Sequence, residues 1–228
     1  MTERRRGIPL PRQARLLAPL AAAWLVSLLV LAALGIQRSI PLEQLFLDPA
    51  TVAGAPWYSG VMSSIGILGW TVAVVAGAGG AWVAHQTERP TAAEFLGAGA
   101  IASAMLLADD LLLLHSNVIP QVTGAPELVA IGLVVAPAAA WVGHWRREVL
   151  RTRWLILAAA LLGSTGSVLV DSLWSSTRAT ALLAEDGAKF LGIVAWATYF
   201  VTTAADITRS TIRAASPVPT TEMSERSA

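Results

Sequence analysis

Residues 95–115 read FLGAGAIASAMLLADDLLLLH, and this stretch decides the fold. About 20 consecutive, mostly apolar residues are enough for an α-helix to cross the hydrocarbon core of a membrane. The run reaches that length, and its only acidic side chains are Asp109 and Asp110, near its end. Ionisable groups inside a membrane span are expensive and mark functional sites by default. We therefore predict a transmembrane helix that carries a functional pair of acids near one end.

The composition of the whole chain agrees with a membrane environment. Of the 228 residues, 55% are hydrophobic and 14% are charged, and the mean hydropathy is +0.60. A soluble domain has about 25% charged residues. The absence of cysteine excludes disulfides and thiolate metal sites. We predict the lipid bilayer and a small-molecule or ion ligand as partners, and no nucleic acid.

Apolar runs of spanning length predict an all-α, polytopic bundle of six transmembrane helices. The predicted spans are about 16–36, 58–84, 95–114, 128–145, 154–173 and 187–207. A basic segment, 1–15, precedes them, and a Ser-, Thr- and Pro-rich tail, 208–228, is predicted to be disordered. The first apolar run is longer than a cleavable signal sequence, so we interpret it as an uncleaved signal anchor.

Arginine positions predict the orientation of these spans, because cytoplasmic loops are enriched in basic residues. With both termini in the cytoplasm, the outside loops contain only Arg38 and Arg178. The cytoplasmic segments then contain Arg4, Arg5, Arg6, Arg12, Arg15, Arg89, Arg146, Arg147, Arg151, Arg153, Arg209, Arg213 and Arg226. We predict a multi-pass protein of the bacterial inner (plasma) membrane.

This orientation places the ionisable residues of the later spans at one level of the outer leaflet. They are Asp109, Asp110, His115, Asp171, Glu185, Asp186 and Lys189. Helical spacing puts Ser103 and Asp110 on one face of the third span. The same spacing puts Glu185, Lys189 and Trp196 on one face of the sixth span, so we expect these polar faces to meet and Trp196 to line a cavity.

Simpler roles remain open for some of these residues. A lysine in a membrane needs a partner, and Lys189 has three candidates: Glu185, Asp110 and Asp171. Alternatively, Glu185 and its neighbour Asp186 stabilise the start of the sixth span, because acids favour a helix N-terminus. The candidate pocket or ion-binding residues are Ser103, Asp109, Asp110, His115, Asp171, Glu185, Lys189 and Trp196.

Three functions fit this cluster. The first is binding or transport of a small molecule or ion, although no polar path crosses the inner halves of the predicted helices. The second is a metal-dependent intramembrane hydrolase, with a divalent metal held by Asp109, Asp110 and His115. The third is a structural or partner-binding role in which buried charges fix helix register. We favour the first.

The run from Ala108 to His115, an Asp-Asp-x4-His pattern followed by Pro120, resembles a pattern in small bacterial membrane proteins of unknown function. In those proteins a second segment, acidic-Gly-x-Lys-Phe-x-Gly, precedes an aromatic-rich helix. Here that segment is residues 186–192, DGAKFLG, with Glu185 before it. The resemblance covers the second half of the chain and implies no particular activity.

A looser similarity is to the alkaline ceramidase and adiponectin-receptor type of membrane hydrolase. Those proteins have seven helices and a zinc ion held by three histidines, with a serine and an aspartate nearby. Ser103, Asp110 and His115 are the matching residues here. This chain has six predicted spans and a single histidine on the outer side, so it lacks the other zinc ligands of that family.

Overall fold

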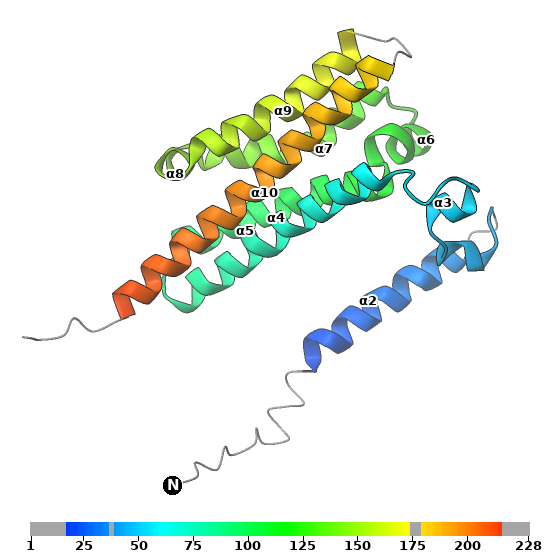
Figure 1. Ribbon diagram of the computed structural model, residues 1–228. Coiled ribbons are helices and arrows are strands. Elements are labelled where there is room, and N and C mark those ends of the chain that lie inside the picture. Colours follow the sequence, from blue (N-terminus) through cyan, green and yellow to red (C-terminus); the bar gives the residue numbers. More distant parts are fainter. Residues whose placement is uncertain (1–16, 37–38, 174–178, 216–228) are drawn as a thin grey trace, which may run out of the picture. The chain divides into compact units, whose positions relative to one another are not determined.

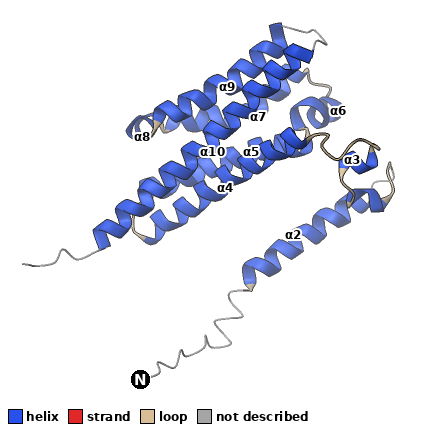
Figure 2. Ribbon diagram, viewed as in Figure 1, coloured by secondary structure: helices blue, strands red, loops and turns tan. Residues whose placement is uncertain are grey.

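The computed structural model describes residues 17–36, 39–173 and 179–215, and every regular element in these residues is a helix (Figure 1, Figure 2). The chain divides into two compact units, with the boundary after Ser59. The first unit contains α2 (Ala18–Gly35), a short 3-10 helix η1 (Leu42–Leu45) and α3 (Pro49–Val52). The carboxylate of Asp48 caps α3 by accepting from the Ala50 backbone N–H at 2.8 Å.

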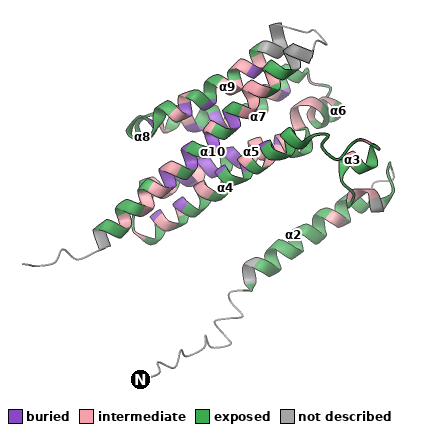
Figure 3. Cartoon of the chain, viewed as in Figure 1, coloured by how far each residue is buried: buried purple, intermediate pink, exposed green. Residues whose placement is uncertain are grey.

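Helix α2 is apolar around its whole circumference. Its aromatic and aliphatic side chains, such as Trp24, Leu28 and Leu29, are exposed within their own unit (Figure 3). A helix that is hydrophobic on all faces is typical of a protein core or a membrane segment, because its apolar side chains are unfavourable in contact with water. This helix corresponds to the first predicted span, 16–36.

The second unit is a bundle built around its last helix. Its elements are α4 (Val61–Gln86), α5 (Pro90–Leu112), η2 (Leu114–Val118), α6 (Ile119–Thr123), α7 (Glu127–His144), α8 (Arg146–Arg151), α9 (Trp154–Leu173) and α10 (Ala179–Ala215). Helix α10 packs against both α9 and α4, α4 packs against α5, and α5 packs against α7 (Figure 1). The central position of α10 brings segments far apart in sequence together.

Small residues permit a close contact of two backbones in the bundle, between α9 and α10. A Cβ atom at Gly163 would lie 2.8 Å from Cα and N of Gly192 and 2.9 Å from the Ala188 carbonyl oxygen. A Cβ atom at Gly192 would lie 2.8 Å from the Ser164 hydroxyl. The two backbones therefore touch here, as small residues at helix interfaces allow in membranes.

An aromatic cluster fills the middle of the bundle. It consists of Trp70, Phe95, Trp141, Trp196, Tyr199 and Phe200, all buried (Figure 3). The ring centroids of Trp70 and Trp196 are 6.1 Å apart, and those of Trp196 and Trp141 are 5.8 Å apart. Buried aromatic rings contribute large contact areas and favourable edge and offset geometries. The aromatic rings join α4, α5, α7 and α10, and Leu157 and Ala160 of α9 belong to the same core.

Four helices are long and apolar enough to cross a membrane: Val61–Gln86, Pro90–Leu112, Glu127–His144 and the Leu183–Arg213 part of α10. Shorter apolar helices occupy Leu20–Gly35 and Trp154–Leu169. These findings confirm an all-helical structure with candidate membrane-spanning helices for the described part of the chain. The four long helices overlap the second, third, fourth and sixth predicted spans, whereas the first and fifth predicted spans coincide with the two shorter helices, so the count of six stays a prediction.

The observed boundaries depart most from the predicted ones at the last helix. Helix α10 begins at Ala179, well before the predicted start at Gly187. Glu185 and Asp186 therefore lie inside the helix, and the prediction that they cap its start is wrong. The helix also continues to Ala215, so the first part of the predicted disordered tail is helical. The remainder of that tail lies outside the described residues.

The third span differs for a simpler reason. Helix α5 begins at Pro90, five residues before the predicted start at Phe95. Proline is favoured in the first turn of a helix, because its fixed φ suits the helix and its missing N–H would have no partner there.

Candidate ligand pocket

A cavity of about 390 Å³ lies toward one end of the bundle, where α5 ends and α7 begins. Residues of five helices and of η2 line it. They are Trp70, Leu106, Asp109, Asp110, His115, Ser116, Glu127, Ile131, Val134, Val135, Ala138, Leu161, Ser164, Ser167, Val168, Glu185, Lys189 and Trp196. This volume lies within the range of small-molecule sites, and an apolar wall with a few convergent polar groups is typical of them.

Asp110 connects three helices on one side of the cavity. Its Oδ1 atom lies 2.7 Å from Nζ of Lys189 on α10. Its Oδ2 atom accepts a hydrogen bond from Nε1 of Trp70 on α4 at 2.7 Å. Both carboxylate oxygens are therefore used in short, charge-assisted contacts. Of the three partners proposed for Lys189, the structure shows this cross-helix pair with Asp110; Glu185 lines the same cavity.

Asp109, the adjacent residue, serves a separate partner because successive helical residues point about 100° apart. Its carboxylate oxygens lie 2.8 and 2.7 Å from Nδ1 of His115, and Oδ1 also accepts the His115 backbone N–H at 2.9 Å. A carboxylate on one ring nitrogen fixes the orientation of the imidazole. The other nitrogen, Nε2, is then the ring atom that remains to meet a proton or a ligand.

A local distortion of the backbone makes the Asp109–His115 contact possible. Helix α5 ends at Leu112, and the next residue, Leu113, has the left-handed values φ 54° and ψ 48°. The next turn, η2, is a π-helix that contains His115. Left-handed conformations are uncommon for residues with a Cβ, and π turns occur often at functional sites. The distortion turns the chain back so that His115 reaches the residue six positions earlier.

Trp196 forms the inner end of the cavity. Its Nε1 donates to the Ser103 hydroxyl at 2.9 Å, and that hydroxyl donates to the Gly99 carbonyl at 2.8 Å. The aromatic cluster continues directly from Trp196 through Trp141. Ser103 is fully buried behind Trp196 and does not line the cavity. Its hydroxyl therefore holds the indole of Trp196 in place and does not itself face a ligand.

The structure thus brings together most of the residues that the sequence singled out. Asp109, Asp110, His115, Glu185, Lys189 and Trp196 all line the cavity. Asp171 lies in the last turn of α9, and its side chain is outside the described part of the structure. The separate polar faces of α5 and α10 do meet, as their spacing predicted.

The candidate residues predicted from the sequence did not include Trp70 and Glu127, which contribute an indole and a carboxylate to the cavity wall. Trp70 was not singled out, although it lies deep in its span rather than at an end, where tryptophans usually mark the membrane interface. Glu127 lies just before the predicted fourth span, 128–145, and is the first residue of α7. The same orientation that grouped the other acids would also have placed Glu127, at the start of α7, on their level.

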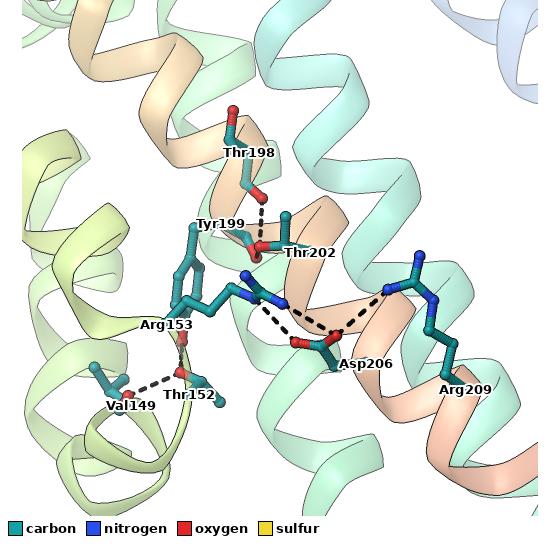
Figure 4. Close-up of polar contacts among 8 residues, drawn as sticks. All are labelled: Val149, Thr152, Arg153, Thr198, Tyr199, Thr202, Asp206 and Arg209. Atoms are coloured by element: carbon teal, nitrogen blue, oxygen red, sulfur yellow. Dashed lines mark hydrogen bonds and ion pairs between the residues drawn. The ribbon is translucent and has the colours of Figure 1, made fainter. Parts of the chain in front are cut away.

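Arginine pairs characterise the opposite end of the bundle (Figure 4). Nε of Arg153 lies 3.0 Å from the Asp206 carboxylate, and Nη1 of Arg209 lies 3.8 Å from it. The hydrogen bond to Asp206 raises the pKa of Arg153. Thr152 directly precedes Arg153, and its hydroxyl lies 2.8 Å from the hydroxyl of Tyr199. Arg89 reaches Ser210 from the α4–α5 connection at 2.6 Å.

Within the described residues, no three His, Asp or Glu side chains form a group that could hold a metal ion. Asp109 is bonded to His115, and Asp110 is bonded to Lys189 and Trp70, so the two aspartates face different partners. A divalent metal at Asp109, Asp110 and His115 stays a prediction. Its binding requires at least one of these contacts to open.

Comparisons with known proteins place the chain in a family. No curated protein and no solved structure matches it. A family model described as a domain of unknown function (DUF8692) matches residues 18–203. That range runs from the first residue of α2 into α10 and contains every described residue of the cavity wall. The chain therefore belongs to this family, the domain of unknown function DUF8692.

Proposed function

We propose that this membrane protein binds a small molecule or ion in the cavity lined by Asp109, Asp110 and Lys189. The observation that carries the proposal is a cavity of about 390 Å³ at which side chains from five helices converge, with ionisable groups from four segments. A purely structural role for the charges predicts that they pack against one another without a cavity. Helix packing alone therefore does not account for the space beside them.

The inner end of the cavity favours binding over passage through the bundle. Trp196 closes it, and the buried rings of Trp141, Tyr199 and Phe200 follow along the same axis. A transport path through this core requires the aromatic rings to separate. Binding needs no such movement, because the cavity already exists beside the charged groups.

A metal-dependent hydrolase is the second candidate, and the Asp109–His115 contact favours it. Metal-bound histidines commonly give their other ring nitrogen to a carboxylate, which orients the ring toward the metal. Here Asp109 occupies Nδ1 in that manner. The metal would act through Nε2 of His115, with a carboxylate of the cavity as a further ligand.

Thermal unfolding of the protein in lipid nanodiscs tests both candidates. A ligand that binds only the folded state raises the unfolding temperature in proportion to its occupancy. The probes are sodium, magnesium and zinc ions, hexanol, hexanesulfonate and hexyltrimethylammonium. We expect at least one probe to stabilise the protein, and Ile131→Trp to abolish the shift because the indole fills the cavity beside α7.

Leu133→Trp is the matched control, since Leu133 is exposed on the same helix and does not line the cavity. A shift that survives Ile131→Trp, or a panel in which no probe produces a shift, contradicts binding in this cavity. A shift given by zinc alone and lost in His115→Ala supports the hydrolase instead.

We also propose that six spans place the cavity on the outer side of a bacterial inner membrane, with both termini in the cytoplasm. The separation of charges along the bundle supports this orientation: the described arginines of the second unit lie at the end opposite the cavity. Reporters of cytoplasmic and periplasmic location, fused after Ala215 and inserted after Gly124, test it. A periplasmic signal at Ala215 contradicts the six-span orientation.

A further inference from the structure

The chemistry of the cavity wall indicates what kind of molecule it accepts. We propose that the ligand is an organic cation with an apolar body, and that it enters from the lipid between α7 and α9. This inference rests on the proposed binding function. It adds a sign of charge, a division of the ligand into head and body, and a route of entry.

Negative charge predominates among the groups that line the cavity. Four carboxylates, from Asp109, Asp110, Glu127 and Glu185, face it together with one lysine and one histidine. The carboxylates exceed the cations by three when His115 is neutral and by two when it is protonated. Lys189 is paired with Asp110 at 2.7 Å, so its charge is already balanced locally. The remaining field attracts a cation, because charges interact strongly where water is partly excluded.

Two tryptophans make the same wall suitable for an organic cation. Trp70 and Trp196 both line the cavity, with their ring centroids 6.1 Å apart. Trp70 is fixed through its indole N–H, which donates to Asp110. Indole rings beside carboxylates attract ammonium groups through the negative face of the ring, and this attraction increases when the cation is desolvated. A small hydrated metal ion would not use these rings.

Aliphatic side chains form the rest of the cavity and are suited to an apolar body. They come from three helices: Leu106 on α5, Ile131, Val134 and Val135 on α7, and Leu161 and Val168 on α9. Burial of each methylene group against such a wall contributes a favourable transfer free energy. A cation without an apolar portion would leave this wall unused.

The apolar part of the cavity reaches the outer surface of the bundle. Val135 and Leu161 line the cavity, yet they are 44% and 39% exposed. Both lie near the middle of their helices, which is the depth of the hydrocarbon in a membrane span. Helix α7 packs mainly against α5, whereas α9 packs mainly against α10. A ligand dissolved in the bilayer therefore meets the opening between α7 and α9 directly.

Equilibrium dialysis in nanodiscs tests the sign of the charge with hexyltrimethylammonium and hexanesulfonate, which share a chain and differ in their heads. We expect the cation to bind and the anion not to compete with it. The double variant Glu127→Gln with Glu185→Gln should weaken cation binding at least about tenfold. Glu94→Gln with Glu148→Gln removes the same charge outside the cavity and should leave binding unchanged.

Two further comparisons test the body and the route. Tetramethylammonium, which lacks the chain, should bind at least about tenfold more weakly. Leu161→Trp should slow association of hexyltrimethylammonium, whereas Leu162→Trp, at an exposed neighbour that does not line the cavity, should not. Equal binding of both head groups, or no effect of the paired glutamine substitutions, overturns the inference. The proposed function would still hold after that result if at least one probe binds and Ile131→Trp abolishes its binding.

Discussion

The two ends of the helical bundle use charged residues in different ways. At the cavity end, Asp110 is only 12% exposed and contacts Lys189 and Trp70 from two other helices. At the opposite end, Asp206 is 47% exposed and contacts arginines at the surface (Figure 4). Exposed pairs contribute little to stability, because water and salt screen them. A charge held away from water needs its partners, because losing one leaves the other unsatisfied.

This difference separates two purposes of ionisable groups in one bundle. The positions of the surface arginines agree with the distribution of basic residues expected on the cytoplasmic side of a membrane. That distribution depends on the charge of the residues more than on the geometry of their contacts. The residues at the cavity depend on geometry, since each of Asp109 and Asp110 meets a specific atom of its partner at 2.7 Å. Substitutions that preserve charge should therefore be tolerated at one end and harmful at the other.

A substitution that forces α9 away from α10 should cause the largest loss of stability. It should disturb the cavity end of the bundle first, because both helices line the cavity. Gly163→Ala places a Cβ atom 2.8 Å from the Gly192 backbone, which has no flexible side chain to move aside. We expect a loss of about 2–3 kcal/mol in the free energy of unfolding. Unfolding in mixed detergent micelles, followed by circular dichroism, measures it.

Gly166→Ala is the control on the same helix, because nothing lies within 4 Å of the Cβ position there. Alanine favours a helix over glycine, so this variant should be neutral or slightly more stable. Equal destabilisation by both substitutions would contradict a close α9–α10 contact at Gly163.

Removing the charge of Asp110 should have a smaller but specific effect. Asp110→Asn leaves Lys189 without its carboxylate partner at the cavity wall, while the side chain keeps nearly the same shape. Lys189 is 42% exposed, so water compensates for part of the loss. We expect destabilisation of about 1–2 kcal/mol, measured by the same unfolding assay. Adding Lys189→Met should recover part of it, because the unpaired charge is then absent.

The smallest effect is expected at the opposite end. Asp206→Asn removes an equivalent charge from the exposed contact with Arg153, and should change stability by less than about 1 kcal/mol. The little that it contributes should disappear in high salt, whereas the Asp110→Asn effect should persist. If Asp206→Asn is as harmful as Asp110→Asn, the distinction between the two ends is wrong.

Much of the arrangement could be predicted from the sequence. Apolar length identified every long helix, because membranes require about 20 apolar residues whatever the packing. The arginine positions predict an orientation that groups the acids of different helices on one level, and in the structure Asp110 and Glu185 line one cavity. Helical spacing then predicted that Asp110 and Lys189 lie on faces that meet, and the structure places them in contact.

The contacts that the sequence did not indicate depend on the tertiary structure. Trp70 donates to Asp110 across 40 positions, and no pattern in the Gly-rich α4 marks that pairing. His115 reaches Asp109 only because Leu113 adopts a left-handed conformation that leucine rarely takes. The extent of α10 was also missed, since apolar length identifies the part of a helix in lipid and not the turns beyond it.

The length of α10 has a mechanical consequence. A helix from Ala179 to Ala215 measures about 55 Å at 1.5 Å per residue, which exceeds the hydrocarbon thickness of about 30 Å. Lys189 lies on one side of the tight contact at Gly192, and Asp206 lies on the other. A second tight contact, where a Cβ atom at Gly80 would lie 2.8 Å from Cβ of Ala204, holds the helix close to Asp206. A stiff rod held at both points acts as a strut, so a shift of Lys189 along the helix axis would carry Asp206 with it.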